Sequence, residues 1–321
     1  MTASNAIKNI AIVGATGKLG SLIFENLMAN PNFNITAITR RANDRLDASA
    51  RTNSNVKIAA GSYESGEFLV PALNNQDALV LALGFEAQNT AQVSIIGAAA
   101  KAGIKWVLPT EFGADNANER VRDSVMINSS KTHVRRRIED LGMKWIGIAT
   151  NPWFDYSLKG GFFSIDAAKH TATLFDKGTT KFNTTTMSTV GLAVARLLAL
   201  PITSENGASL SQYTNNFCYI ASFLVSQREI LDSVQRVSGT TDKDWEIKEQ
   251  SVDRYLAEGN EMIKNGNFMG AVNSLYGTNY IEGAGGNYQD AKALSNGILG
   301  LPKEDLDEVV KVVLHELRSR E

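Results

Sequence analysis

Residues 9–20 read Asn-Ile-Ala-Ile-Val-Gly-Ala-Thr-Gly-Lys-Leu-Gly, and they say more about the fold than any other stretch of the chain. The apolar run at the start predicts a buried strand, and a helical pattern follows the last glycine. A strand, a glycine turn and a helix in this order are typical of a dinucleotide-binding unit. Gly14 permits a tight turn, Gly17 lets the backbone approach a pyrophosphate, and Gly20 lets the helix pack closely on the strand.

The helix that follows the turn adds a physical reason to expect a phosphate. Its first N–H groups lack partners within the helix, and the helix dipole favours an anion at that end. The alternative is a glycine-rich strand–helix turn in another kind of α/β protein.

Composition limits the class of protein. The 321 residues suit one large domain or two closely joined ones, and 43% of them are hydrophobic, so a sizeable core can form. A net charge of −2 argues against bulk electrostatic binding to nucleic acid or to an anionic membrane. Cys218 is the single cysteine, which excludes an intramolecular disulfide. Because no apolar run has the length of a membrane span and residues 1–8 lack an apolar signal core, we expect a cytoplasmic protein.

Short apolar runs alternate with helical segments in the first half of the chain. They cover residues 9–13, 34–39, 56–59, 77–83, 105–109 and 143–149. The alternation predicts an α/β fold with a doubly wound parallel Rossmann sheet. We assign residues 1–150 to a dinucleotide-binding domain and 151–321 to a smaller C-terminal substrate-binding region.

The second region has weaker patterns. Residues 188–198 and 227–237 predict helices, and residues 217–221 predict a strand that returns to the sheet. From residue 240 onward the chain is expected to be mostly helical, with a glycine-rich break at 283–286.

Two predicted strand ends carry residues suited to a nucleotide. The second strand ends in Arg40 and Arg41, where an acidic residue would bind the ribose 2′-hydroxyl of NAD and an arginine accommodates the 2′-phosphate of NADP. A solvated arginine pair is the alternative, and Arg40 is the stronger candidate. The fourth strand runs into Gly84, which allows close approach of a cofactor ribose or is a simple turn glycine.

A lysine stands out on a predicted helix over residues 129–142. Val134, Ile138 and Leu141 form the apolar stripe of this helix, and Lys131 lies on the same stripe in the first turn. The helix dipole and partial burial both lower the pKa of such a lysine, so it could exchange protons near neutral pH. The alternative is a lysine that extends to solvent.

Other polar groups are less informative. The arginines 135–137 are expected on a solvated surface, and three scattered histidines have no metal-ligand spacing, so no metal is expected. Tyr156 and Lys159 are one residue too close for the Tyr-x-x-x-Lys pair of ordinary short-chain dehydrogenases.

Together these segments resemble the NmrA-like and isoflavone-reductase-like family of atypical short-chain dehydrogenases. The resemblance rests on residues 14–20, on Arg40, on residues 81–84, and on residues 106–113, which are similar to the family's strand ending Pro-Ser-Glu-Phe-Gly. It is specific over residues 8–157 and loose beyond them.

Two further segments match the family and one departs from it. Lys131 falls where the family carries its catalytic lysine, and Asn151–Tyr156 resembles the segment that borders nicotinamide and substrate. The family often has Gly-Asp after the third strand, whereas this chain has Gly61 and Ser62.

The resemblance implies NADP(H) as cofactor and a small-molecule substrate. The sequence does not decide between a monomer and a homodimer. Lys131 is implied as the catalytic residue. The implied cofactor contacts are Gly14, Thr16, Gly17, Lys18, Leu19, Gly20, Arg40, Arg41, Leu83, Gly84, Phe85, Thr110, Glu111, Phe112, Lys131 and Asn151. The implied substrate contacts are Phe112, Pro152, Trp153 and Phe154.

Two functions fit these expectations. The first is an NADPH-dependent reductase of a small aromatic or conjugated metabolite, in which the nicotinamide delivers hydride and Lys131 handles the proton. The second is a non-enzymatic NADP(H) sensor that binds a regulatory partner. An inward lysine favours the enzyme, because a sensor does not need one there.

Overall fold

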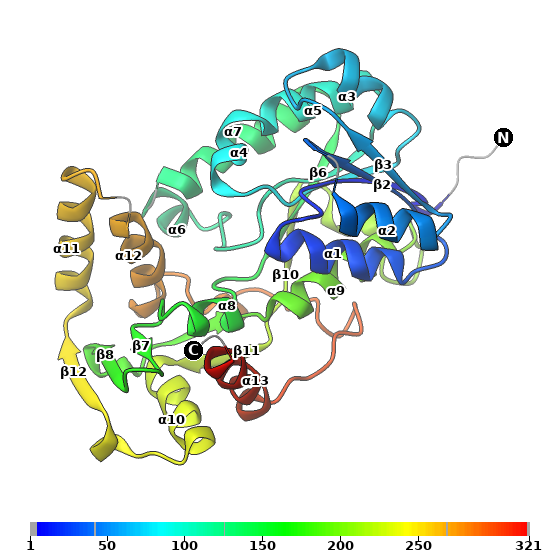
Figure 1. Cartoon of the computed structure of the whole chain (residues 1–321). Helices are drawn as coiled ribbons and strands as arrows, with labels where there is room; N and C mark the ends of the chain where they lie inside the picture. Colours follow the sequence, from blue (N-terminus) through cyan, green and yellow to red (C-terminus); the bar gives the residue numbers. More distant parts are fainter. Residues whose placement is uncertain (1–4, 42, 125, 268, 320–321) are drawn as a thin grey trace.

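The centre of the molecule is a seven-stranded parallel sheet with the strand order β10-β6-β5-β4-β1-β2-β3 (Figure 1). The structure is a computed structural model that describes residues 5–41, 43–124, 126–267 and 269–319. The strands of the sheet are β1 Asn9–Val13, β2 Asn34–Thr39, β3 Val56–Ala60, β4 Ala78–Leu81, β5 Trp106–Leu108, β6 Lys144–Ala149 and β10 Asn216–Tyr219.

The strand order reverses beside β1. The chain runs outward from β1 through β2 to β3, and then returns to β4 on the other side of β1. Val13, at the end of β1, therefore lies beside both Ile38 of β2 and Leu81 of β4. In open α/β sheets, ligands bind at such a reversal, outside the carboxyl ends of the strands. The expected doubly wound Rossmann fold is confirmed.

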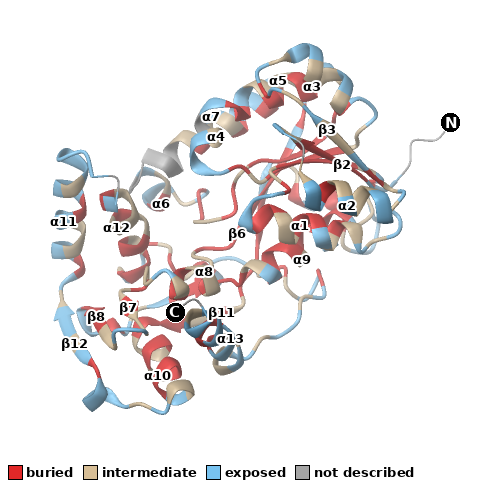
Figure 2. Ribbon diagram, viewed as in Figure 1, coloured by how far each residue is buried: buried red, intermediate tan, exposed pale blue. Residues whose placement is uncertain are grey.

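Helices cover both faces of the sheet, because successive side chains of each strand point to opposite faces. Ile12 belongs to the core under one helical layer, and Val13 belongs to the core under the other. Figure 2 shows the resulting buried centre between helices whose outer faces are exposed. The helices of this half are α1 Lys18–Met28, α2 Asp44–Thr52, α3 Gly66–Leu73, α4 Phe85–Thr90, α5 Gln92–Lys101, α6 Glu119–Ser124, α7 Met126–Asp140 and α9 Met187–Leu198.

The predicted strands match the structure closely. The bounds of β1 and β2 are those predicted, and the predicted returning strand is present as β10, which pairs in parallel with β6. The fourth strand is shorter than predicted, because the chain leaves the sheet at Ala82 and Gly84 then caps α4. Helices α4 and α5 meet at Ala91, which ends the first and begins the second.

The remaining elements gather on the side of the molecule opposite α2 and α3 (Figure 1). They enclose a third apolar core, which contains Phe154, Phe163 and Phe182. They are α8 Phe154–Lys159, β7 Ile165–Asp166, β8 Thr171–Phe175, β9 Lys181–Thr184, β11 Phe223–Ser226, α10 Gln227–Ser238, β12 Glu246–Gln250, α11 Val252–Lys264, α12 Met269–Gly277 and α13 Leu306–Arg318.

The expectation of mostly helix beyond residue 240 is wrong at two places. Strand β12 pairs in parallel with β8, although its sequence is largely charged and exposed. The segment between α12 and α13 contains only short 3-10 turns. The division at residue 150 stays a prediction, although α9 and β10 lie beyond it and pack against the first half. In the described part of the chain, no helix is long and apolar enough to cross a membrane.

Candidate active site

The glycine turn after β1 has the geometry expected of a phosphate cradle. Gly14 has a φ of +93°, and a Cβ there would lie 2.2 Å from the carbonyl oxygen of Ala82. A Cβ on Gly20 would lie 1.9 Å from the carbonyl oxygen of Gly14, so α1 packs directly on the turn. Gly17 is the N-cap of α1 and gives the helix no side-chain cap. The first N–H groups of α1 therefore remain suited to an external anion.

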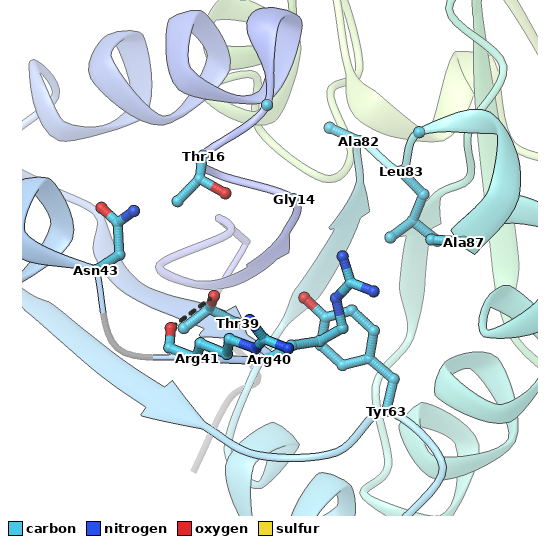
Figure 3. A pocket seen from close by; sticks show the side chains of 12 residues that line it. Gly14, Thr16, Thr39, Arg40, Arg41, Asn43, Tyr63, Ala82, Leu83 and Ala87 are labelled. Carbon is cyan, nitrogen blue, oxygen red and sulfur yellow. Dashed lines mark hydrogen bonds between the residues drawn. The ribbon is translucent and has the colours of Figure 1, made fainter.

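Beside the turn lies a cavity of about 610 Å³ that extends toward the ends of β2 and β4 (Figure 3). The described residues that line it include Arg40 and Arg41 but no carboxylate. The Arg40 guanidinium lies 5.9 Å from the ring centroid of Tyr63, and the Tyr63 hydroxyl donates to the carbonyl oxygen of Ile38 at 3.3 Å. Burial raises the pKa of Tyr63 and Arg40 opposes this, so the phenol stays neutral beside the arginine. This cavity has the charge expected of a phosphate-bearing site.

A second cavity, of about 480 Å³, adjoins the first and shares Gly17, Ala82, Leu83 and Gly84 with it. It follows the carboxyl ends of β4 and β5. The predicted residues Lys18, Leu19, Gly20, Phe85, Thr110, Phe112 and Lys131 line it. The Thr110 hydroxyl donates to the Leu81 carbonyl oxygen at 3.0 Å, which holds the loop after β5 against β4.

A third cavity, of about 220 Å³, lies on the far side of Lys131. The second and third cavities share Phe112, Lys131, Trp153 and Tyr156. Helix α12 contributes Leu275 and Tyr276 to this cavity, and the predicted residues Asn151 and Pro152 line it too. The amine-bearing side chain therefore lies where the two cavities meet.

Lys131 is 9% exposed and has a buried carboxylate nearby. Its Nζ atom lies 3.9 Å from Oε2 of Glu111, which is itself only 1% exposed. Burial lowers the pKa of Lys131, Arg135 adds to this effect, and Glu111 opposes it. The inward placement inferred from the helical pattern is thus present in the structure.

One prediction about an individual residue is wrong, and two site assignments fall on side chains that do not line the cavities. Arg135 is buried rather than solvated, because it lies one turn after Lys131 on the inward face of α7 and pairs with Glu111. The Glu111 side chain lies behind the cavity wall, where Arg135 and Asn116 bind its two oxygens, and its contact with a cofactor stays a prediction. Phe154 is fully buried against Phe163 and Phe223 in the third apolar core, and its contact with a substrate stays a prediction.

Several cavity residues were missed from the sequence. Tyr63 lines the first cavity, Gln88 lines the second, and Tyr276 and Asn279 line the third. Tyr156 was set aside because of its spacing from Lys159, yet its ring lies in the cavity wall with the Lys18 amine 4.6 Å from the ring centroid. The position of Tyr156 in the segment after the sixth strand could have identified it as a cavity residue.

Tyr276 had no such signal, because it reaches the site from a helix 120 residues further along the chain than Tyr156. Lys159, the other half of the rejected pair, binds Glu316 elsewhere. In the described ranges, no group of three histidine, cysteine, aspartate or glutamate side chains could hold a metal ion.

The NmrA-like family model matches residues 6–191, which include strands β1 to β6 of the sheet, the glycine turn and Lys131. The chain belongs to the NmrA-like family. A relative from Aspergillus flavus, "Oxidoreductase aprR", is 26% identical over 95% of this chain and 98% of its own length.

Solved structures share the fold of this chain. A crystal structure of isoflavone reductase superposes with a TM-score of 0.75 at 20% identity, covering 96% of this chain and 99% of that one. An NADPH-dependent quinone oxidoreductase from Escherichia coli, complexed with NADPH, superposes with a TM-score of 0.67 at 20% identity over 95% and 99% of the two chains.

Proposed function

We propose that this NmrA-like protein reduces a small aromatic or conjugated molecule with hydride from NADPH, and that Lys131 handles the proton. The coarser assignment, an oxidoreductase that uses NADP(H), follows from the family and from full-length relatives named oxidoreductases. The observation that supports the reductase and the proton role is the position of Lys131. Its side chain lines both the second cavity, on the cofactor side, and the third cavity, beneath α12.

The residues present fit a dinucleotide. The pyrophosphate would lie against Gly17 at the start of α1, where helix N–H groups are available and a side chain is absent. The adenosine half would occupy the larger cavity, and Arg40 would bind its 2′-phosphate through charge-assisted hydrogen bonds. A preference for NADP(H) over NAD(H) follows from this charge.

The cavity beneath α12 supports a flat, apolar substrate. Its walls include the side chains of Phe112, Trp153, Tyr156 and Tyr276, and its polar groups are Lys131, Asn151 and Asn279. Aromatic walls favour stacked or edge-on contacts with a ring, and few polar groups fix its orientation. A volume of about 220 Å³ suits a molecule of one or two rings.

Lys131 is suited to the proton step of a reduction. When bound, NADPH supplies a hydride to one atom of the substrate, and a proton must reach a second atom. Because burial lowers the pKa of Lys131, its ammonium group releases a proton more readily than that of an exposed lysine. Its amine lies at the junction of the two cavities, where a substrate oxygen would meet the cofactor.

A screen of NADPH oxidation tests this function. The purified protein is mixed with NADPH and with phenolic, quinone and enone compounds, and loss of NADPH absorbance is recorded. We expect turnover of at least one class, with NADPH strongly preferred over NADH. Tight NADPH binding without oxidation in any class would contradict the reductase and favour a sensor that binds NADP(H) without reaction.

A further inference from the structure

Glu111 lies between two cations of α7, but it contacts them unequally. Arg135 binds Oε1 of Glu111 directly, and Asn116 donates to Oε2 at 2.7 Å. The Lys131 amine lies 3.9 Å from Oε2, beyond hydrogen-bond distance. Both oxygens of the carboxylate are therefore already bound by groups other than Lys131.

Arg135 is itself held in place on several sides. It is 7% exposed, and its guanidinium donates to the Thr132 hydroxyl at 3.1 Å as well as to Glu111. The guanidinium also lies 5.3 Å from the ring centroid of Trp145 and 5.2 Å from that of Phe217. Cation–π contacts with two rings and a direct ion pair fix this side chain toward Glu111 and away from the cavity.

The protonation state of Lys131 depends on the charges of Glu111 and Arg135 beside it. Arg135 and Glu111 together are neutral, so a protonated Lys131 leaves one net positive charge in a buried site, and a neutral Lys131 leaves none. In the described part of the chain, Glu111 is the carboxylate that lies within 4.0 Å of the Lys131 amine.

Other titratable groups face Lys131 from the elements packed around it. Lys18 of α1, Tyr156 of α8 and Tyr276 of α12 line the same cavities. Burial raises the pKa of Tyr276, so it stays neutral. Asp115, in the loop that also carries Glu111, accepts a hydrogen bond from the Tyr219 hydroxyl at 3.0 Å.

We propose that Arg135 is a positioning residue, which occupies the Glu111 carboxylate and so prevents it from pairing directly with the Lys131 amine. This inference rests on the proposed function, because it explains how the amine is kept available to a substrate. Lys131 and Arg135 are one helical turn apart on the same face of α7, so both reach the loop of Glu111. In the described part of the chain, Glu111 pairs with Lys131 and Arg135, so loss of Arg135 leaves Lys131 as its cationic partner.

The test measures the pKa of Lys131 directly, without cofactor or substrate. The protein is labelled with ¹³C-lysine, and the Lys131 Cε chemical shift is followed against pH and assigned by its loss in Lys131→Arg. Arg135→Gln should raise this pKa by about one pH unit or more, because an opposite charge a few ångströms away then pairs with the amine alone. Glu111→Gln should lower it, because two cations then remain together.

Two control variants distinguish a positioning role of Arg135 from a general loss of structure. Arg136→Gln removes the same charge from the next, exposed residue of the same helix and should leave the pKa of Lys131 unchanged. Arg135→Lys keeps the charge and should shift the pKa less than Arg135→Gln does. A variant that merely loosened the fold would not produce shifts of opposite sign in the Arg135 and Glu111 variants.

The pH dependence of kcat/KM distinguishes this inference from the proposed function. If the NMR pKa shifts as expected and the profile shifts with it, both are supported. If the NMR pKa shifts but the profile does not, Arg135 still positions the amine and the proton role of Lys131 is wrong. If Arg135→Gln and Glu111→Gln leave the NMR pKa unchanged, or move it in the same direction, the positioning role is overturned.

Discussion

Replacement of Gly17 tests the phosphate cradle, because the chain accepts a methyl group there with a shift of a few tenths of an ångström, whereas a bound pyrophosphate would leave no space for it. A Cβ on Gly17 would lie 3.3 Å from the carbonyl oxygen of Gly14 and 3.9 Å from that of Ala82. The residue has φ −75° and ψ 167°, which an alanine adopts without strain. Alanine is a poorer N-cap than glycine, so Gly17→Ala should cost about 0.5–1 kcal/mol of stability.

Gly20→Ala is the matched comparison from the same turn. Its Cβ would lie 1.9 Å from the backbone oxygen of Gly14, so the helix and the strand end must separate. We expect the free energy of unfolding to fall by about 1–3 kcal/mol or more, as at other overpacked positions. The two glycines therefore separate a binding defect from a folding defect within four residues of sequence.

Thermal unfolding without ligand and calorimetric titration with NADPH provide the two readouts. Gly17→Ala should unfold within a few degrees of the native protein and bind NADPH at least about 10-fold more weakly, which is a loss of about 1.4 kcal/mol. The bulkier Gly17→Val should abolish binding while the fold survives. Native-like NADPH affinity in a folded Gly17→Val protein would refute the reasoning and move the phosphate site elsewhere.

Two other predictions concern charge. Arg40→Ala should weaken NADPH binding by about 1.5–3 kcal/mol and leave NADH binding nearly unchanged, because it removes a charge-assisted phosphate contact; equal affinity of the native protein for both dinucleotides, measured by calorimetry, would contradict it. Burial raises the pKa of Asp155, so its contribution to stability is present at low pH and is lost as the pH rises through the folded-state pKa. Asp155→Asn should therefore raise Tm at pH 7, and the gain should shrink as the pH falls toward 4; a constant gain would exclude this linkage.

Short apolar patterns in the sequence were sufficient to predict most strands of the central sheet. The apolar runs gave the bounds of β1 and β2 because buried parallel strands read as continuous apolar stretches. Strand β12 was missed for the converse reason, since it lies at the edge of its sheet and is mostly polar and exposed.

The residues expected to bind the cofactor could also be predicted from short stretches of sequence. Gly14 and Arg40 each follow a strand end, and parallel strands bring their carboxyl ends to one edge of the sheet. The third cavity was predicted in part, because Phe112, Pro152 and Trp153 follow strand ends. Tyr276 could not be predicted in this way, since it arrives from α12 and nothing near it in sequence marks a cavity.

Arg135 shows the limit of a helical pattern. The stripe of α7 correctly placed Lys131 inward, but the position one turn later carries an arginine, which the pattern assigned to solvent. Its burial depends on Glu111, which lies 24 residues earlier in sequence. A buried ion pair of this kind requires the partner to be known in space.

The most direct test of the account is the turnover of Lys131→Ala beside its affinity for NADPH, on a substrate found in the screen. We predict that kcat falls by about 10²–10⁴-fold, because a general acid–base group is lost, while NADPH affinity stays within a few-fold. Lys131→Arg should not restore turnover, since a guanidinium does not release its proton near neutral pH. Near-native turnover by Lys131→Ala would contradict the account and assign the proton step to another group.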